Sequence, residues 1–500
     1  MKKAITLYIK RFVALLRSHF WLVLFGLSSE IIYFFYLVHD FPITRYWPDL
    51  TDMGVISNFS HAGFLKFLLL FAALFGLYGL AWQQVRVSGY AATRFIILAF
   101  GFIFAATAVF VYPVTAIDIF VYIANSLVLV QHHANPLITA PAQFAGQDPL
   151  MDLAGGFEAL PSPYGPLAMA VQALPTAIAG RNVLLTLILM KSFFSVLLLI
   201  TAWLIYKILA RMAPEFALAG MLALAWNPFV LFEYAANGHN DIMMIFLMVL
   251  AVYFLGKDDH LLALLCIVAS ALIKFASLPL IPLFFIYSIM HLVSKEKRLS
   301  YVIWGPIASV FFCIVCFLPF WAGPQTFLRV FNQTQDRLYS FPMFLSDLCV
   351  TVISFAEARW IGMALFGCCF IGGLLGLLGL WKEGRTLSGL LKASFLTLLG
   401  LLAFGVTYIQ VWYIIWPIIF VLLLPGRRAF FVGGMLASMA ICVELVHAYV
   451  WPWGAYANPD AFTIANSIVY LILFAPTLFY LVGSRLTQIF SISRSPSRLL

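Results

Sequence analysis

Residues 183–209 read VLLTLILMKSFFSVLLLITAWLIYKIL, a stretch in which Lys191 and Lys207 are the only charged residues. A helix of this length is about 40 Å long, enough to cross the roughly 30 Å hydrocarbon core of a bilayer. Comparable apolar stretches recur along the 500-residue chain, which is 64% hydrophobic and 10% charged. A single water-facing surface cannot accommodate that composition. We therefore predict an all-α fold, a polytopic transmembrane helical bundle.

Fourteen apolar segments are predicted to cross the membrane. They are residues 20–38, 64–82, 95–112, 183–209, 216–234, 241–256, 261–275, 277–293, 302–321, 360–381, 393–409, 411–424, 429–448 and 464–483. Residues 167–180 and 344–356 are too short or interrupted, so we expect interfacial or half-inserted helices there. Irregular backbone at membrane depth is tolerated beside protein or water, which indicates a cavity on the outer side.

We predict a single integral membrane domain over residues 1–500, with about 13–14 spans and interfacial helices in the outer loops. Residues 1–94 hold the N-terminal anchor spans, residues 95–293 form a core with a polar loop at 113–166, and residues 294–500 form a C-terminal helical bundle. The seven cysteines lie mostly in apolar segments. We therefore expect no disulfide framework and no zinc site.

The net charge of +9 is spread over short connections between apolar segments rather than over one basic face. This pattern favours a positive-inside topology over nucleic-acid binding. With the basic N-terminus inside, every connection predicted inside carries Lys or Arg, and both termini are cytoplasmic. The loop at 113–166 has four acidic residues and no Lys or Arg, so we expect it outside. The pattern fits a bacterial cytoplasmic membrane, and an endoplasmic reticulum protein with a lumenal site would show it too.

A first polar group follows the third predicted span. If a helix begins after Pro113, then Asp118, Tyr122 and Asn125 recur at i, i+4 and i+7 and form one polar stripe. Such a helix would lie in the interface and aim a carboxylate at the membrane surface. Alternatively, Asp118 caps or solvates a surface helix.

A second polar group lies between two apolar spans. Its members fall within nine residues and are Glu233, Asn237, His239, Asn240 and Asp241. A tight outer turn would explain the two amides and Gly238, but not Glu233 and His239 as well. We expect this group on the same side of the membrane as Asp118.

A third candidate is Lys274, at the predicted outer end of its span. It either snorkels to the headgroups or holds an anionic phosphate. Lys66 and Lys191 lack comparable polar neighbours and are interpreted as snorkelling. Tyr164 belongs to the segment that closes the acidic loop, Ser162 to Leu167. The loop that contains Arg329, Asp336, Arg337 and Tyr339 is either a phosphate or acceptor contact or a solvated loop.

Sugar transfer from a polyprenyl phosphate is the chemistry that these groups suit. It needs a carboxylate base for the acceptor hydroxyl, and cationic or hydrogen-bonding groups for the leaving phosphate. Asp118 suits the base, and Lys274 with His239 suits phosphate or acceptor contact. The chain has no Walker motif or phosphate-cradling Gly-rich loop, so ATP and soluble nucleotide-sugar chemistry have no support.

Several motifs carry a family resemblance. They are Asp118 to Tyr122, with Phe120 in place of a tyrosine; Asn135-Pro136-Leu137; Pro163 to Leu167; Asn227-Pro228 with Gly238 to Asp241; and Lys274 to Pro282. The chain resembles the GT-C superfamily, most closely the actinobacterial polyprenol-phosphomannose-dependent α-1,6-mannosyltransferases. The resemblance implies a GT-C-like core at 95–293, an outward-facing site, a catalytic aspartate at Asp118 in the loop 113–166, and inverting displacement at the anomeric carbon.

We therefore interpret the chain as a membrane glycosyltransferase with Asp118 catalytic. The expected substrate-binding residues are Tyr122, Asn125, Tyr164, Glu233, Asn237, His239, Asn240, Asp241 and Lys274. Its expected partners are a polyprenyl-phosphate sugar, a glycan or lipid-linked acceptor and membrane lipid, with no nucleic acid. No metal ligands are assigned, since a lone His132-His133 pair is weak evidence, and a divalent ion is left open.

Two alternatives come from other classes. The first is a secondary transporter or flippase, although transporters favour midplane sites on broken helices and paired repeats. The polar motifs here cluster at one face, and no repeat is visible. The second is an accessory subunit with a degenerate site.

Overall fold

The computed structural model describes residues 19–47, 49–85, 90–327, 337–349, 352–455 and 461–483. Over these ranges the chain forms helices and turns, with three isolated β-bridges and no strand. Eight of the helices are long and apolar enough to cross a membrane, or nine if one bent pair counts as a span. The prediction of an all-α polytopic helical bundle is confirmed. The basic residues before 19 and after 483, with Arg86, Arg329 and Asp336, lie outside the described residues.

The eight long apolar helices coincide with predicted spans. They are His19–Val38, α4 (His61–Val85), α5 (Tyr90–Val109), α8 (Val183–Met212), α14 with η7 (Lys295–Phe320), α17 with η10 (Phe355–Leu380), α18 with η11 (Leu387–Gly405), and α20 with its continuation (Arg427–Trp453). Phe311 on α14 and Leu318 on η7 are 67% and 72% exposed. Exposed apolar surface of this extent is expected where lipid is the solvent.

Several predicted spans are helical but shorter. They are α11 (Asp241–Leu255), α12 (His260–Ile273), α13 (Leu280–His291), η12 with α19 (Val411–Leu422) and Ile464–Phe479 of α22 (Ala461–Gly483). Lys274 has an extended backbone that ends α12, and Pro279 precedes α13. Proline cannot donate the hydrogen bond that would continue a helix, so these spans are separate short elements.

The predicted span at 216–234 is broken. The segments Pro214–Ala225 and Pro228–Ala236 meet at a bend of 43°. They contain η4 (Pro214–Phe216), α9 (Ala217–Ala225), α10 (Pro228–Leu231) and the π-helical turn η5 (Phe232–Ala236). Asn227 Oδ1 accepts hydrogen bonds from the main-chain N–H groups of Phe229 and Val230, so a new helix is capped there.

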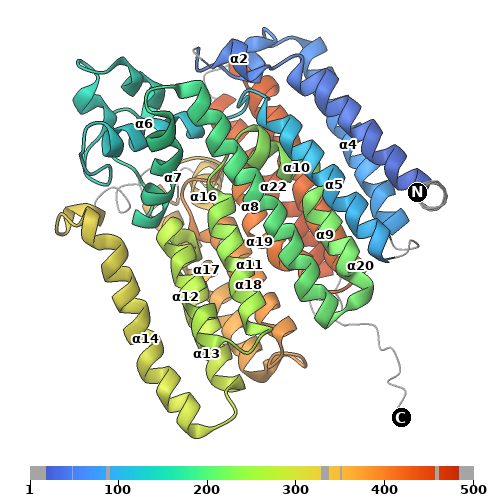
Figure 1. The fold of residues 1–500 in the computed structure, drawn as a ribbon, viewed down its shortest axis with the longest axis vertical. Coiled ribbons are helices and arrows are strands. Elements are labelled where there is room, and N and C mark those ends of the chain that lie inside the picture. The colour runs from blue at the N-terminus through green and yellow to red at the C-terminus, as the bar shows by residue number, and fades with distance from the viewer. Residues whose placement is uncertain are drawn as a thin grey trace, which may run out of the picture. The chain divides into compact units, whose positions relative to one another are not determined.

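The helices group into two compact units. The first takes its residues from 1–133, 141–159 and 172–242, and the second from 134–140, 160–171 and 243–500. In the first unit α5 packs on α8 and α9, and α6 (Asp118–Val130) packs on η3 (Pro149–Phe157) and α8 (Figure 1). Short elements complete it: η1 (Tyr33–Val38), α2 (Ile43–Tyr46), α3 (Met53–Ile56) and η2 (Pro141–Phe144).

Lys191 is a correction within the first unit. Its side chain is fully buried, and Nζ donates to the main-chain oxygens of Ala108, at 3.3 Å, and of Val111. These carbonyls lie at the C-terminal end of α5, where a cation is favourable because the helix leaves its last carbonyls unbonded. The interpretation of Lys191 as a snorkelling residue is therefore wrong.

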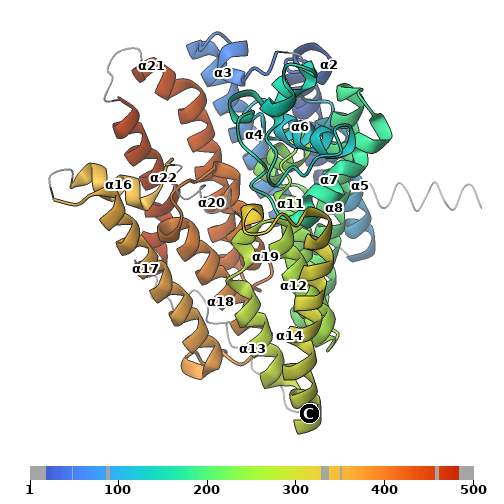
Figure 2. The same ribbon diagram turned by 90° about the vertical axis from the view of Figure 1, so that its left-hand side faces the viewer.

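The second unit contains the helices from α12 onward. In it α14 packs beside α12 (Figure 1), while α16 (Phe341–Leu348) lies across the end of α17 (Figure 2). Gly362 lets α17 approach η11 closely, since a Cβ there would lie 2.3 Å from the carbonyl oxygen of Phe404. The remaining elements are η6 (Phe275–Ser277), η8 (Gln325–Phe327), η13 (Val446–Val450) and α21 (Trp451–Ala455), and α7 (Pro166–Ala179) joins the two units.

Candidate active site

Asp118 is the first residue of α6, and its side chain is half-buried. An acidic side chain in the first turn interacts favourably with the partial positive charge of a helix N-terminus. The helix expected after Pro113 is present and begins at Asp118, while residues 113–117 are non-helical. Val114 explains why: its carbonyl accepts from the N–H of Met53 at 2.8 Å, and its own N–H is bonded to a distant side chain.

That distant side chain is Asn237. Its Oδ1 accepts from the main-chain N–H of Val114 at 3.0 Å, and its Nδ2 donates to Thr115 Oγ1 at 2.6 Å. Nδ2 also donates to Glu233 Oε2 at 3.0 Å. Both amide hydrogens and one lone pair are thus used by the protein itself. Asn237 ties the connection that leads into Asp118 to the turn of the second polar group.

Gly238 brings the same turn against α6. Its backbone has φ of +78°, and a Cβ there would lie 2.6 Å from Ile119 Cδ1 and 3.2 Å from Lys191 Cγ. Only glycine adopts this conformation without steric cost, and only glycine leaves room for Ile119. The turn at Gly238 to Asp241 therefore packs on the first turn of α6, beside Asp118. The structure brings together the two polar groups that the sequence placed on one side.

Glu233 and His239 form a fully buried pair. Glu233 Oε2 lies 3.2 Å from His239 Nε2, and the main-chain N–H of His239 donates to the carbonyl of Glu233 at 3.1 Å. Glu233 belongs to the π-helical turn η5, and such turns are frequent at functional sites. Asp241 begins α11 next to this pair and is also fully buried.

Two buried groups beside this pair retain unused hydrogen-bonding capacity. The amide of Asn240 and the hydroxyl of Tyr234 are fully buried and have no hydrogen-bond partner among the described residues. Buried polar groups are nearly always bonded to protein, water or a ligand. These two side chains are therefore candidates for contact with a bound molecule.

Tyr122 and Asn125 do not form an exposed stripe. Both are buried, and Asn125 Nδ2 donates to the carbonyl of Val121 within α6 at 2.9 Å. That α6 lies in the membrane interface stays a prediction. The i, i+4, i+7 spacing was present, but α6 turns that face toward the interior of the first unit, where it packs on α8 and η3.

Lys274 and Tyr164 lie together in the second unit. The ammonium of Lys274 is 4.1 Å from the ring centroid of Tyr413, 4.9 Å from that of Trp416 and 5.7 Å from that of Tyr164. Cation–π contacts of this kind orient an ammonium. Sequence reasoning missed Tyr413 and Trp416. Their i, i+3 spacing in residues 411–416, VWYIIW, is the signal that was available.

Two of the proline motifs form turns in the second unit, and one of them contacts the end of α12. The N–H of Gly165 donates to the carbonyl of Ile273 at 3.0 Å, and a Cβ on Gly165 would lie 2.0 Å from the carbonyl oxygen of Leu272. Asn135 Oδ1 accepts from the N–H of Leu137 at 3.0 Å. The segment at Pro163 to Leu167 therefore docks on the end of α12, which places Tyr164 beside Lys274.

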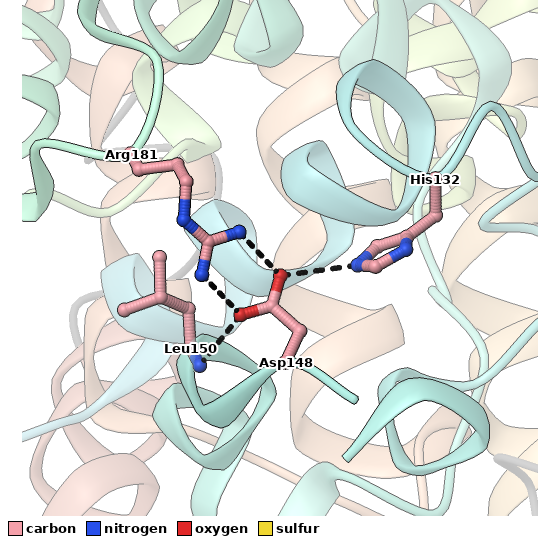
Figure 3. A network of polar contacts seen from close by, with 4 residues as sticks. All are labelled: His132, Asp148, Leu150 and Arg181. Carbon is pink, nitrogen blue, oxygen red and sulfur yellow. Dashed lines mark hydrogen bonds and ion pairs between the residues drawn. The ribbon is translucent and has the colours of Figure 1, made fainter. Parts of the chain in front are cut away.

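Asp148 links the acidic loop at 113–166 to Arg181. Its carboxylate accepts two hydrogen bonds from the Arg181 guanidinium, at 2.9 and 2.7 Å, and lies 3.1 Å from His132 Nε2 (Figure 3). The N–H of Leu150 donates to it at 3.0 Å. The bonds from Arg181 lower the pKa of Asp148 to about 2. Sequence reasoning assigned Asp148 only to the charge of the loop.

Comparison with known protein families identifies a family that this chain resembles. Residues 44–290 match the family described as alpha-(1->6)-mannopyranosyltransferase, N-terminal domain. Over these residues the chain is similar to that mannopyranosyltransferase family. The resemblance inferred from the motifs is confirmed. A search of curated proteins found no match.

The region that matches the mannopyranosyltransferase family contains Asp118, the turn at Gly238 to Asp241, and Lys274 with Tyr164. Tyr413 and Trp416 lie beyond it. Across the part of the chain that the structure describes, no group of three or more His, Cys, Asp or Glu side chains is arranged to hold a metal ion.

Proposed function

We propose that the chain transfers mannose from a polyprenyl-phosphate donor to an extracytoplasmic glycan or lipid-linked acceptor. The family match supports mannosyl transfer, and the long apolar helices support a lipid-borne donor. The observation that carries the proposal is the packing of Gly238 to Asp241 on the first turn of α6, which holds Asp118 beside buried polar groups.

In the proposed reaction, Asp118 is the general base. It takes the proton from the acceptor hydroxyl as that oxygen bonds to the anomeric carbon, and the bond from this carbon to the phosphate oxygen breaks. The electron pair leaves with the polyprenyl phosphate. Displacement inverts the anomeric carbon, so an α product requires a donor whose phosphate is β-linked.

Other residues keep the roles that their chemistry suggests. Lys274, oriented by Tyr413 and Trp416, supplies positive charge for a phosphate oxygen. Asn240 offers an amide without protein partners among the described residues, which suits a sugar hydroxyl. Glu233, His239 and Asp241 are proposed to line the same part of the first unit, while Tyr122 and Asn125 support α6 from its buried face.

The proposal places the protein in a bacterial cytoplasmic membrane with the loop at 113–166 outside. The Arg pair at 427–428 begins α20, in agreement with a basic cytoplasmic face. A transporter or flippase of a lipid-linked or anionic substrate is the alternative, and the broken helix at Asn227 is the observation that favours it. The family match favours the enzyme.

The test uses the full-length protein in membranes with polyprenyl-phosphate [³H]mannose and an α-1,6-linked oligomannoside. We expect label to become covalently attached to the acceptor. Asp118→Asn should lower the rate by about two to four orders of magnitude. Asp152→Asn, an exposed acid of the same loop, is the matched control and should be fully active. Label that moves across the membrane without forming a bond would instead identify a transporter, and full activity of Asp118→Asn would remove Asp118 from the mechanism.

A further inference from the structure

Another group of polar residues, here called the Glu444 cluster, lies in the second unit around Glu444 of α20. The side chain is only 4% exposed, and no described residue gives it a hydrogen bond or ion pair. The helix that carries it is one of the candidate spans. An ionisable side chain in a membrane-spanning helix is energetically costly and commonly marks a functional site. The burial of Glu444 in this helix therefore indicates a functional role.

Tyr339 interacts electrostatically with Glu444 and has a strained backbone conformation. The phenol lies within electrostatic range of Glu444, and its hydroxyl is bonded to His447 Nδ1. The backbone of Tyr339 has φ of +48°, which is a rare conformation for a bulky residue and is typical of functional sites. Its N–H donates to Asn466 Oδ1 at 3.1 Å, which fixes this conformation.

The chain on both sides of Tyr339 is also held. The N–H of Leu338 donates to the carbonyl of Thr407 at 3.0 Å, and the N–H of Ile409 donates to the carbonyl of Leu338 at 2.9 Å. Ser340 follows directly, and its buried hydroxyl has no partner among the described residues. The segment is thus rigid but retains unused hydrogen-bonding capacity.

His447 adds an aromatic surface to the cluster. It lies in η13, a π-helical turn that continues α20, and its ring is parallel to that of Trp451, with centroids 5.8 Å apart. A π-helical turn also carries Glu233 in the first unit. Such turns widen a helix and recur at functional sites.

The cluster lies far from the basic end of its helix. Glu444 follows Arg427 by 17 residues, which is about 25 Å along a helix. Under the positive-inside topology this is the extracytoplasmic end, where a glycan would arrive.

The chemistry of the cluster selects the ligand. The cluster of Glu444, Tyr339, Ser340 and His447 contains no lysine or arginine for a phosphate, and Arg337 nearby in sequence is directed at the ring of Phe355, 3.8 Å from its centroid. A carboxylate, hydroxyls, an imidazole and an aromatic ring suit a molecule that presents many hydroxyl donors and an apolar face. A sugar ring has both properties.

We propose that Glu444, Ser340 and Tyr339 form a carbohydrate-binding subsite of the second unit, which holds hydroxyl groups of the acceptor glycan. The inference rests on the proposed function, since it assigns the acceptor to a site outside the matched family region. Glu444 accepts from sugar hydroxyls, and Ser340 and Tyr339 complete their hydrogen bonding.

The experiment compares Glu444→Gln with the unchanged protein in mannosyl transfer to α-1,6-linked mannotriose. We expect the KM for the acceptor to rise at least tenfold, with the KM for the donor unchanged. Thermal stability should hold, because the amide has the size of the carboxyl group that it replaces. Glu215→Gln is the control and should behave as the unchanged protein, because Glu215 is exposed and has no hydrogen bond or ion pair among the described residues.

A second measurement separates the two proposals. Binding of mannotriose to the Asp118→Asn protein in nanodiscs is followed by saturation-transfer NMR, with and without Glu444→Gln. Loss of the signal in the double variant supports the subsite. If the unchanged protein transfers mannose but Glu444→Gln has the same acceptor KM and binding, the subsite is overturned while the proposed function stands. If the unchanged protein transfers no mannose but still binds mannotriose through Glu444, only the proposed function fails.

Discussion

Asn237 Oδ1 accepts a hydrogen bond from the main-chain N–H of Val114, and the two residues are 123 positions apart in the chain. Val114 precedes Asp118 by four residues, so the amide determines where α6 begins and hence where its first carboxylate lies. The amide also bonds Thr115 and Glu233. The hydrogen-bonding capacity of the Asn237 amide is therefore used by protein partners. We infer that Asn237 positions Asp118 rather than contacting substrate.

Asn237→Ala should therefore lower kcat without a matching rise in KM. A misplacement of about 1 Å at a reacting group can cost about a hundredfold in rate. Thr115→Val removes one of the three bonds and should lower kcat less. Steady-state kinetics with varied donor and acceptor measure both parameters. A raised donor KM with unchanged kcat would restore the direct substrate contact that the sequence predicted for Asn237.

Gly238→Ala tests the packing of the turn on α6. The added Cβ would lie 2.6 Å from Ile119 Cδ1, in a backbone conformation with φ of +78°. We expect loss of activity and a destabilisation of about 1–3 kcal/mol, seen as a lower Tm in detergent. Adding Ile119→Ala should recover part of both, because it removes the clashing atom.

Gly156→Ala is the control for this prediction. It lies in the same unit, and a Cβ there would meet no atom within 4 Å. Its Tm and activity should match those of the unchanged protein. Equal stability of Gly238→Ala would show that α6 can move away from the turn, and the predicted coupling between Gly238 and Ile119 would be absent.

The local start of α6 illustrates what sequence patterns leave out. Apolar runs of 18 or more residues predicted most helices well, and α8 begins at Val183 as expected, because hydrophobic length is a local property. The start of α6 depends on a bond to Asn237, and no pattern near Pro113 encodes it. Lys191 was misread for the same reason, since its acceptors belong to another helix.

The residues of the candidate site also divide into those that the sequence marks and those that only the structure brings together. Asp118, Glu233, His239 and Lys274 could be selected from sequence because ionisable groups beside apolar runs are costly. Tyr413 and Trp416 were missed, since aromatic residues in a hydrophobic segment carry no such cost and only their i, i+3 spacing marks them. Their distances to the Lys274 ammonium, more than 130 residues earlier in the chain, show what that spacing serves.

Lys274→Met should weaken the donor contact. In the proposed reaction the Lys274 ammonium binds a phosphate oxygen of the donor. Without it the donor KM should rise about tenfold or more, with a smaller effect on the acceptor KM. Trp416→Leu removes one ring of the aromatic surround and should give a weaker effect of the same kind. Lys257→Met is the control, because Lys257 also lies over a ring, that of Tyr253 at 5.8 Å, and is exposed. An unchanged donor KM in Lys274→Met would leave Lys274 without a phosphate role.

The Asp148–Arg181 pair should make the loop at 113–166 sensitive to acid. The pKa of Asp148 is lowered to about 2 by the bonds from Arg181, below the unfolded value of about 3.9. A lowered folded-state pKa contributes stability that is fully present above the unfolded pKa and is lost as pH falls through the folded one. The contribution should therefore be constant above about pH 5 and disappear between roughly pH 4 and pH 2.

The contribution of the Asp148–Arg181 pair to stability is measured by limited proteolysis of residues 141–159 at neutral pH, with Arg181→Gln compared with the unchanged protein. The guanidinium is 54% exposed, so solvent screens the pair and cleavage should accelerate modestly, up to about fivefold. An acid-active protease should cleave the unchanged protein faster as pH falls from 4 to 2, whereas Arg181→Gln should lose most of this pH dependence. Equal pH dependence in the two proteins would mean that another group, rather than the Arg181 contact with Asp148, controls the opening of the loop.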